Sequence, residues 1–269
     1  MTDLRVLPIE GLPEVKEGMK VGELIAERAE LEPGDIVVIS QKIVSKAEGQ
    51  VRHLRDVKPS EKAIELAKKL GKEAELVELI LSESREILRA ERGILITETH
   101  HGFVCANAGI DSSNLPETNT VCLLPLDPDN SARTIRTELQ RAIEDPGVGV
   151  AGPSPLLSAD PHPRVLPPAV VIADSFGRAW RLGQAEVAIG CAGLVSLDDW
   201  RGRRDAGGRE LSATVIAVAD EIASAADLTR KKDEGVPVAI VRGLDHYVIA
   251  EDGPGAAALH RPPGEDLFR

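Results

Sequence analysis

Aromatic side chains are scarce in this chain of 269 residues: Phe, Trp and Tyr together make up 2% of it. Proteins that bind single-stranded nucleic acids stack the bases on aromatic rings, so this composition argues against that class of function. The formal net charge of −12 argues against nucleic acid in general and against an anionic membrane as the main partner. We therefore expect no nucleic-acid partner and no membrane partner. With 42% hydrophobic residues and few aromatics, the core must consist of Val, Ile, Leu and Ala.

Cysteine is also rare, and its three residues form no metal-binding or disulfide pattern. Cys105, Cys122 and Cys191 each lie among apolar residues and without CxxC spacing. We therefore expect buried, reduced thiols, and neither a disulfide framework nor a zinc site. The chain also lacks an apolar run of membrane-spanning length, and its N-terminus lacks the basic and apolar regions of a signal peptide. These absences predict a soluble, cytoplasmic protein.

The stretch 101–114, HGFVCANAGIDSSN, contains the first cluster of candidate functional residues. Its apolar run predicts a short strand that breaks into a turn at residues 107–109. Small polar side chains follow the turn at Asp111, Ser112, Ser113 and Asn114. Such residues favour turns, but their oxygens are also hard ligands for a divalent cation. By itself this stretch fits either a capped turn or a cation site.

A second polar cluster follows another β-branched run, VVIA. This strand is predicted to end in Asp174 and Ser175, with Arg178 and Arg181 close behind. A carboxylate and a hydroxyl at the carboxyl end of a strand can hold a metal ion, and arginines can bind the phosphate or carboxylate that the metal bridges. An exposed, arginine-rich loop is the alternative. We expect Asp111 and Asp174 to converge on shared cations.

Cationic side chains occur at two further places in this acidic chain. Lys46 follows the buried strand predicted for residues 35–40. It is either a solvated residue at the rim or a phosphate ligand, because α/β proteins hold phosphates at strand ends. Residues 198–210 include four closely spaced arginines, Arg201, Arg203, Arg204 and Arg209. Solvated charge is the simplest explanation of this loop, and the negative charge of the remaining chain favours anion binding as the alternative.

The hydrophobic pattern predicts helices at residues 60–89, divided at Gly71, and at about 212–226. A high density of Pro and Gly at residues 145–168 predicts a long surface loop or an insertion. The tail after Asp252 is rich in Gly, Pro and Ala and is expected to be disordered.

Nine short motifs, taken together and in order, resemble those of the coenzyme F420-0:L-glutamate ligases, a family that attaches glutamate to a deazaflavin cofactor. Each motif is modest alone, but the set covers roughly residues 4–250 in the family's order. The motifs are Glu10-Gly-Leu-Pro13, Ser45-Lys-Ala-Glu-Gly49, Asn107-Ala-Gly-Ile-Asp-Ser-Ser-Asn114, Leu126-Asp-Pro-Asp129, Asp174-Ser-Phe-Gly-Arg178, Asp199-Trp-Arg-Gly-Arg203, Gly208-Arg-Glu-Leu211, Ala219-Asp-Glu-Ile222 and Val241-Arg-Gly243. Some actinobacterial members carry a second, flavin-binding domain downstream, which we do not expect here because the chain ends too early.

The resemblance implies a mixed-sheet α+β fold of the F420 gamma-glutamyl ligase type that forms an intertwined homodimer. It implies a ligase domain over residues 1–250, with two subdomains and the insertion near 145–168, and a flexible tail over residues 251–269. It also implies a GTP-dependent ligase with Mg²⁺ or Mn²⁺, and leaves K⁺ open as a further cation. GTP would activate the terminal carboxylate of coenzyme F420-0 as an acyl phosphate, which the amine of L-glutamate would attack. Later rounds would use the γ-carboxylate of the added glutamate.

The family's functional residues map onto this chain position by position. Its metal ligands correspond to Asp111, Asp174 and Ser175. Its nucleotide contacts correspond to Glu10, Gly11, Leu12, Pro13, Gln41, Lys42, Lys46, Asn114, Arg230, Lys231 and Lys232. The groups that we expect to bind substrate or phosphate are Arg178, Arg181, Arg203 and Arg209. We assign no general base, because none is needed if the amine of glutamate arrives unprotonated.

One departure from the family's pattern lies between the last long helix and the final strand. The family usually has a Met-Gly pair there, often followed by a carboxylate or an amide, whereas this chain has Thr229, Arg230, Lys231 and Lys232. An ammonium at Lys231 cannot ligate a cation, although it can contact phosphate oxygens, so the two-metal site of the family is in question here. Two alternatives stay open: a catalytically silent paralogue that binds a nucleotide or the deazaflavin, and the same ligase chemistry on another phosphorylated carboxylate.

Overall fold

The computed structural model describes residues 3–266, apart from residues 114, 116, 145–165 and 232. Asn114, Lys232 and most of the predicted insertion therefore lie outside the described residues. Helices and strands both occur throughout the rest of the chain, and the largest sheet is mixed, in agreement with the predicted α+β class. Within the described ranges, no helix is both long and apolar enough to cross a lipid bilayer.

A five-stranded sheet with the order β1-β12-β2-β8-β9 forms the centre of the molecule. Its strands are β1 Arg5–Ile9, β2 Ile36–Ser40, β8 Ala169–Arg178, β9 Arg181–Ala192 and β12 Val238–Arg242. Strands β2 and β8 run parallel, whereas the other neighbouring pairs are antiparallel. Parallel neighbours need a crossover connection, and here the chain builds several further elements between β2 and β8.

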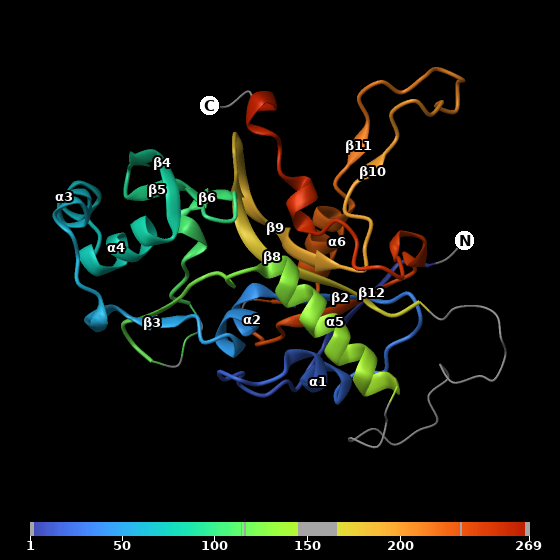
Figure 1. Cartoon of the computed structure of the whole chain (residues 1–269), viewed down its shortest axis with the longest axis horizontal. Coiled ribbons are helices and arrows are strands. Elements are labelled where there is room, and N and C mark those ends of the chain that lie inside the picture. The colour runs from blue at the N-terminus through green and yellow to red at the C-terminus, as the bar shows by residue number, and fades with distance from the viewer. Residues whose placement is uncertain (1–2, 114, 116, 145–165, 232, 267–269) are drawn as a thin grey trace.

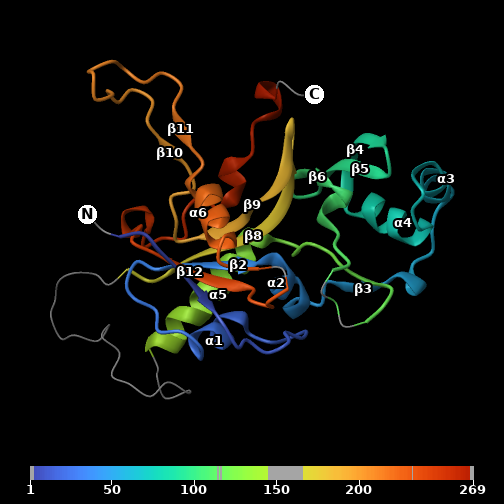
Figure 2. The same cartoon turned by 180° about the vertical axis from the view of Figure 1, so that it is seen from behind.

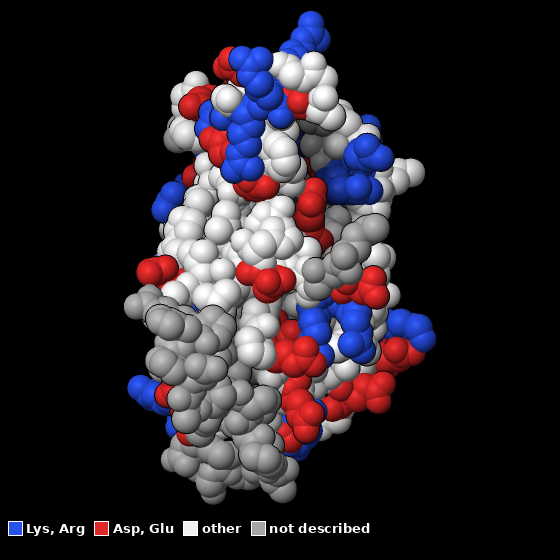
Figure 3. All heavy atoms as spheres, turned by 90° about the vertical axis from the view of Figure 1, so that its right-hand side faces the viewer, with Lys and Arg blue, Asp and Glu red and all other residues white. Residues whose placement is uncertain are grey.

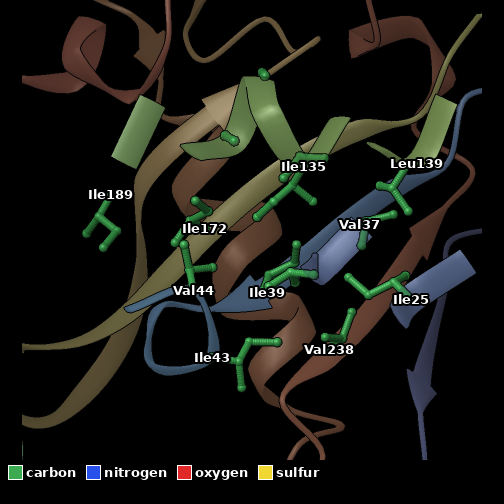
Figure 4. Packing of buried hydrophobic residues seen from close by; sticks show 14 of the residues in the cluster. Ile25, Val37, Ile39, Ile43, Val44, Ile135, Leu139, Ile172, Ile189 and Val238 are labelled. Atoms are coloured by element: carbon green, nitrogen blue, oxygen red, sulfur yellow. The ribbon is translucent and has the colours of Figure 1, made fainter. Parts of the chain in front are cut away.

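Helices cover both faces of this sheet because its strands carry apolar residues on both sides. The helices on its faces are α1 Val21–Ala26, α2 Gln41–Ala47, α5 Pro128–Glu144 and α6 Val218–Asp227. The other two, α3 Glu61–Leu70 and α4 Ala74–Ser82, pack in a separate cluster. In β2, Val37 and Ile39 belong to a core that includes residues of α1 and α5 (Figure 4). The alternate residues Ile36 and Val38 belong to a second core with α6. Figures 1 and 2 show α5 and α6 on opposite sides of the sheet.

A smaller module built from α3, α4 and a three-stranded sheet stands beside the central sheet (Figure 1). Its strands are β4 Ser84–Glu91, β5 Ile94–Thr99 and β6 Val104–Ala106. The module has its own apolar cluster, which includes the buried residues Val77, Ile80 and Leu95. The remaining paired strands are β3 Val51–His53 with β7 Thr120–Cys122, and β10 Asp198–Asp199 with β11 Val215–Ile216. The short 3₁₀ helices are η1 Leu54–Asp56, η2 Asn107–Gly109, η3 Asp245–Tyr247, η4 Ala256–Leu259 and η5 Pro263–Glu265.

The predicted helix at residues 60–89 is correct in its first part and wrong at its end. Ser60 caps α3, and Gly71 ends it in the left-handed conformation at φ 66°, as the division at Gly71 predicted. Residues 84–89, however, belong to β4, which pairs with β5 through a tight turn. Arg92 and Gly93 in this turn have φ values of 51° and 77°, which matches the two left-handed residues of a type I′ hairpin. The second predicted helix also starts later than expected, because residues 215–216 form β11 and α6 begins at Val218.

The tail after Asp252 is more ordered than expected. The carboxylate of Asp129, in the first turn of α5, accepts hydrogen bonds from the backbone nitrogens of Ala256 and Ala257 at 2.7 and 3.2 Å. It also accepts one from the backbone nitrogen of Cys191 at 2.9 Å. Ala256 is completely buried. A single carboxylate thus joins η4 of the tail to β9 and α5, which corrects the expectation of a wholly flexible tail.

All three cysteines are buried free thiols, as predicted. Burial raises the pKa of Cys105 and Cys191 to about 12. It raises the pKa of Cys122 to about 11. The thiols therefore stay protonated at neutral pH and behave as small apolar groups.

Candidate active site

A cavity of about 860 Å³ lies where β2 leads into α2. Segments that are far apart in the sequence line it: residues 12–15, the first turns of α2, residues 105–113, the β8–β9 hairpin, and the loop 227–237. The predicted site residues in its lining are Leu12, Pro13, Gln41, Lys42, Lys46, Asp111, Asp174, Ser175, Arg230 and Lys231. Asp111 and Asp174, the two aspartates expected to converge, therefore face the same space.

Helix α2 starts directly after β2 and brings two lysines to the cavity wall. Lys42 and Lys46 are four residues apart, so they lie on the same side of the helix. The Nζ of Lys46 lies 2.6 Å from Oε1 of Glu14, and Lys46 is only 9% exposed. A buried ammonium needs a partner of opposite charge, and Glu14 supplies one. Lys46 is therefore not a solvated rim residue, which was the alternative that its sequence position allowed.

Lys42 joins α2 to the polar turn after β6. Its Nζ lies 2.7 Å from Oδ2 of Asp111, and 2.8 and 2.9 Å from the carbonyl oxygen and Oγ of Ser113. Ser113 in turn donates to Asp111 from its backbone nitrogen and from its hydroxyl, both at 2.8 Å. Asp111 also pairs with Cys122 of β7 through a β-bridge, which fixes its backbone. The turn is thus capped, as one alternative predicted, and its carboxylate also faces the cavity.

The pKa of Asp111 is lower than that of an ordinary aspartate. Burial alone would raise it, but the hydrogen bonds from Lys42 and Ser113 stabilise the charged carboxylate and outweigh burial. Asp111 is therefore ionised at neutral pH. The cavity holds a fixed negative charge at this point.

Asp174 occupies a different backbone position from the one predicted. Strand β8 does not end before it but continues to Arg178, where the hairpin turns into β9. A bulge between Ile172 and Ala173 shifts the register just before Asp174. Bulges re-aim the side chains that follow them, and here Asp174 and Ser175 both line the cavity. The predicted strand tip is corrected to the middle of a long hairpin.

Asp174 and Asp111 have opposite pKa shifts although they share one cavity. Burial first, and then the negative charges of Glu186 and Asp111, raise the pKa of Asp174 to about 7 against weaker opposing contacts. A cation bound beside Asp174 would stabilise its ionised form, because it would offset both the burial and the repulsion from the two anionic neighbours.

Ser175, Glu186 and Arg230 form a connected network across the hairpin and the loop before β12. The Oγ of Ser175 donates to Oε1 of Glu186 at 2.6 Å, and Nη2 of Arg230 lies 3.3 Å from Oε2 of the same carboxylate. Both members of the ion pair are almost completely buried. Glu186 was not predicted as a site residue. It stands opposite Ser175 in the hairpin register, so a correct hairpin prediction would have identified it.

Four predicted phosphate ligands and part of the N-terminal motif do not line the cavity. Arg178 donates instead to the carbonyl oxygens of Gly183 and Leu182, 3.3 and 2.7 Å away, and so stabilises the hairpin turn. Arg181 is exposed at the start of β9. Glu10 and Gly11 are exposed and absent from the cavity lining, and the carbonyl oxygen of Gly11 accepts a hydrogen bond from Nε of Arg28 at 3.1 Å.

The arginines of the β10–β11 loop are also separate from the cavity. Arg203 stacks on the ring of Trp200, 5.0 Å from its centroid, and lies 3.5 Å from Asp198. Arg209 is exposed at the far end of the loop. Figures 1 and 2 show this loop projecting from the body, and Figure 3 shows basic side chains gathered at that end of the molecule. The simpler prediction, solvated charge with local ion pairs, describes this loop.

The cavity contains the oxygen ligands that a hard divalent cation prefers. Asp111 and Asp174 supply carboxylates, and Ser175 supplies a hydroxyl. In the part of the chain that the structure describes, no group of three or more His, Cys, Asp or Glu side chains is close enough to hold a metal ion without other ligands. A cation here would thus need oxygens from a bound substrate as well, which is how Mg²⁺ is usually held beside phosphates.

Comparison with known proteins agrees with this chemistry. The family model described as F420-0:Gamma-glutamyl ligase matches residues 11–243. The chain belongs to this family. Relatives named coenzyme F420:L-glutamate ligase include one from Methanopyrus kandleri, 42% identical over 99% of this chain and 98% of the relative. One from Methanothermobacter thermautotrophicus is 42% identical over 99% of both chains. One from Archaeoglobus fulgidus is 40% identical over 99% of this chain and 96% of the relative.

These matches confirm the predicted membership of the F420-0:gamma-glutamyl ligase family and the prediction of an enzyme of the ligase class. The similarity extends over nearly the whole length of the relatives. The roles of individual residues are a separate question, and they rest on the geometry of the cavity.

Proposed function

We propose that this chain is a GTP-dependent ligase that adds L-glutamate to the tail carboxylate of coenzyme F420-0, and that it then adds further γ-linked glutamates. The relatives named above act on coenzyme F420 and L-glutamate according to their names. The observation that carries the proposal is the shared cavity of Asp111 and Asp174, flanked by Lys42, Lys46 and Arg230. Carboxylates and cations in one cavity suit a reaction between a triphosphate and a carboxylate substrate.

The reaction needs activation because a carboxylate is a poor electrophile. Transfer of the γ-phosphoryl group from GTP to the acceptor carboxylate gives an acyl phosphate and GDP. The amine of L-glutamate then attacks the acyl carbon, the C–O bond to phosphate breaks, and the products are an amide, inorganic phosphate and a proton. Mg²⁺ or Mn²⁺, held by Asp111, Asp174 and Ser175, would reduce the repulsion between the anionic reactants.

The chain's own residues orient the reactants. Lys42 and Lys46 place two ammonium groups on one side of α2, toward the cavity, where they can bind phosphate oxygens. Leu12 and Pro13 contribute an apolar edge, and Gln41 contributes an amide. We propose that these residues, with Arg230 and Lys231, bind the nucleotide. Asn114 and Lys232 stay predicted contacts.

We further propose that the protein acts as a homodimer. The tip of the β8–β9 hairpin carries Trp180 and Leu182, which are 81% and 97% exposed. Exposed apolar side chains that lie together can mark a protein–protein interface. Light scattering should give the mass of two chains, and Leu182→Asp should shift that mass toward one chain.

The experiment that tests the activity is incubation with GTP, Mn²⁺, L-glutamate and F420-0, followed by mass spectrometry of the deazaflavin. A mass increase by one or more glutamate residues, together with phosphate release, supports the proposal. Omitting K⁺ from the buffer tests its participation. Nucleotide binding without glutamate-dependent phosphate release would favour the silent paralogue. Phosphate release only with a different phosphorylated carboxylate would favour the same chemistry on another acceptor.

A further inference from the structure

Arg230 and Glu186 form an ion pair inside the cavity wall, where this chain departs from the family's pattern. Their side chains are 5% and 6% exposed, and Nη2 of Arg230 lies 3.3 Å from Oε2 of Glu186. Nη1 donates to the carbonyl oxygen of Pro237 at 3.2 Å. The Nε–H of Arg230 is buried and has no hydrogen-bond partner in the described part of the chain. A buried donor without a partner is costly, and Arg230 lines the cavity in which an anion would bind.

The ion pair also controls the oxygen ligands next to it. Both oxygens of Glu186 are engaged, Oε2 by Arg230 and Oε1 by the hydroxyl of Ser175 at 2.6 Å. The hydroxyl is thereby oriented, and the negative charge of Glu186 is compensated by the guanidinium. Ser175 is the neighbour of Asp174 on β8, so the fixed positive charge lies at the reaction centre.

A second divalent cation would find few ligands at this end of the cavity. Glu186 is already paired, and the guanidinium of Arg230 would repel a metal ion. Lys231 occupies the position where the family often has an oxygen ligand, and its ammonium pairs with Glu234. Glu14, Asp227 and Asp233 also line the cavity, but in the described part of the chain no three such side chains cluster closely enough to hold a metal ion. Asp111 and Asp174 can hold one cation together with the phosphates of a nucleotide.

We propose that the guanidinium of Arg230, held in place by Glu186, takes the place of a second metal ion, so that this chain binds its nucleotide with one divalent cation per site. The inference rests on the proposed GTP-dependent function. Arg230 binds phosphate oxygens through its planar set of N–H groups. Glu186 also lines the cavity, but both its oxygens are engaged by Arg230 and Ser175, so it acts as a positioning residue for these two side chains.

The test counts Mn²⁺ ions bound per chain by the loss of the electron paramagnetic resonance signal of free Mn²⁺. The full chain is titrated in the presence of a saturating β,γ-imido analogue of GTP. One bound Mn²⁺ per chain supports the inference. Two bound Mn²⁺ per chain, with the nucleotide bound, overturn it and leave the proposed function intact. Absence of nucleotide binding overturns both.

Variants of Arg230 make the test sharper. Arg230→Gly removes the guanidinium and frees Glu186 as a ligand, so we expect two Mn²⁺ per chain. At one equivalent of Mn²⁺, its affinity for the nucleotide should be about 10- to 100-fold lower, which corresponds to the loss of a charge-assisted hydrogen bond. Excess Mn²⁺ should restore much of this affinity, whereas the unaltered chain should show no such rescue. Arg230→Lys should keep a count of one.

Three further variants distinguish a loss of Arg230 positioning from a general loss of structure. Glu186→Gln keeps an acceptor for Ser175 but removes the ion pair, so it should also weaken nucleotide binding, and Glu186→Asp should recover part of the affinity. Arg55→Gly, at a side chain in η1 that is 76% exposed and not part of this network, is the matched control and should change nothing. If circular dichroism shows that Arg230→Gly is unfolded, the number of Mn²⁺ ions bound by the unaltered chain and by Arg230→Lys still decides between one and two cations per site.

Discussion

The ammonium of Lys42 lies 2.7 Å from the carboxylate of Asp111, although the two residues are separated by 69 positions in the sequence. The pair connects the first turn of α2 to the turn after β6. It keeps Asp111 ionised and holds a positive charge at the cavity wall. The arrangement of this pair leads to the first prediction.

Lys42→Met should weaken nucleotide binding by about 10-fold or more, because charge-assisted hydrogen bonds to phosphate contribute about 1.5–3 kcal/mol. Isothermal titration calorimetry with GDP and Mn²⁺ measures this affinity. The matched control is Lys58→Met, an exposed lysine in the connection before α3. Equal affinity for both variants would remove Lys42 from the proposed nucleotide site.

Asp129→Ala should destabilise the fold by about 2 kcal/mol or more, because three backbone N–H groups would lose their acceptor. The free energy of unfolding is obtained from urea denaturation. Glu65→Ala, at an exposed position of α3, is the control and should change it by less than about 0.5 kcal/mol. A similar small change for Asp129→Ala would show that the tail is not held by this carboxylate.

Stability should fall below about pH 6.5 through His260. Burial lowers the pKa of this imidazole, opposed by Asp129 and Glu98 and reinforced by His101 and Arg85. Its Nε2 is buried without a hydrogen-bond partner in the described chain, and the ring packs edge-on against Phe103 with centroids 4.9 Å apart. The unfolded chain therefore binds a proton at His260 at a higher pH than the folded chain does. The stability that the neutral His260 side chain contributes is thus fully present above pH 6.5 and is lost as the pH falls.

The measurement for His260 is urea denaturation across pH 5–8 for the unaltered chain and for His260→Gln. As the pH falls below about 6.5, the unfolding free energy of the unaltered chain should decrease relative to that of His260→Gln. A difference that stays constant over this range would contradict the assignment. Other titratable groups contribute equally to the unfolding free energy of both chains, so their contributions cancel in this difference.

The three thiols should be unreactive toward Ellman's reagent at pH 8 in the folded protein. Burial raises the pKa of Cys122 to about 11 and that of Cys105 and Cys191 to about 12, so thiolate is rare, and none of the three is exposed. In denaturant, all three thiols should become exposed and react with the reagent. Rapid reaction of one thiol in the folded state would show that its element opens readily.

Local sequence signals predicted much of the fold. The apolar run of β2, the cap at Ser60 and the helix end at Gly71 follow from single residues or short patterns. Strand β4 was missed because its Ile and Leu residues also fit a helical spacing. Its decisive feature is a two-residue turn at Arg92 and Gly93 rather than the usual Asn-Gly.

The candidate site was only partly predictable for a similar reason. Asp111 and Asp174 stand out because carboxylates beside hydroxyls follow apolar runs. Glu186 and the role of Arg178 depend instead on the pairing register of the β8–β9 hairpin and on its bulge. Such contacts join residues through the folded backbone, and no local pattern in the sequence specifies them.

We propose that Asp111 and Asp174 together hold the cation, and through it the phosphates, for acyl transfer. The most direct measurement is the mass of F420-0 after incubation with GTP, Mn²⁺ and L-glutamate, compared for the unaltered chain, Asp111→Asn and Asp174→Asn. We predict glutamylated product with the unaltered chain and a loss of at least about 100-fold in rate with either variant, as expected when a group that stabilises the transition state is removed. Glutamylation at an unchanged rate by both variants would contradict the account.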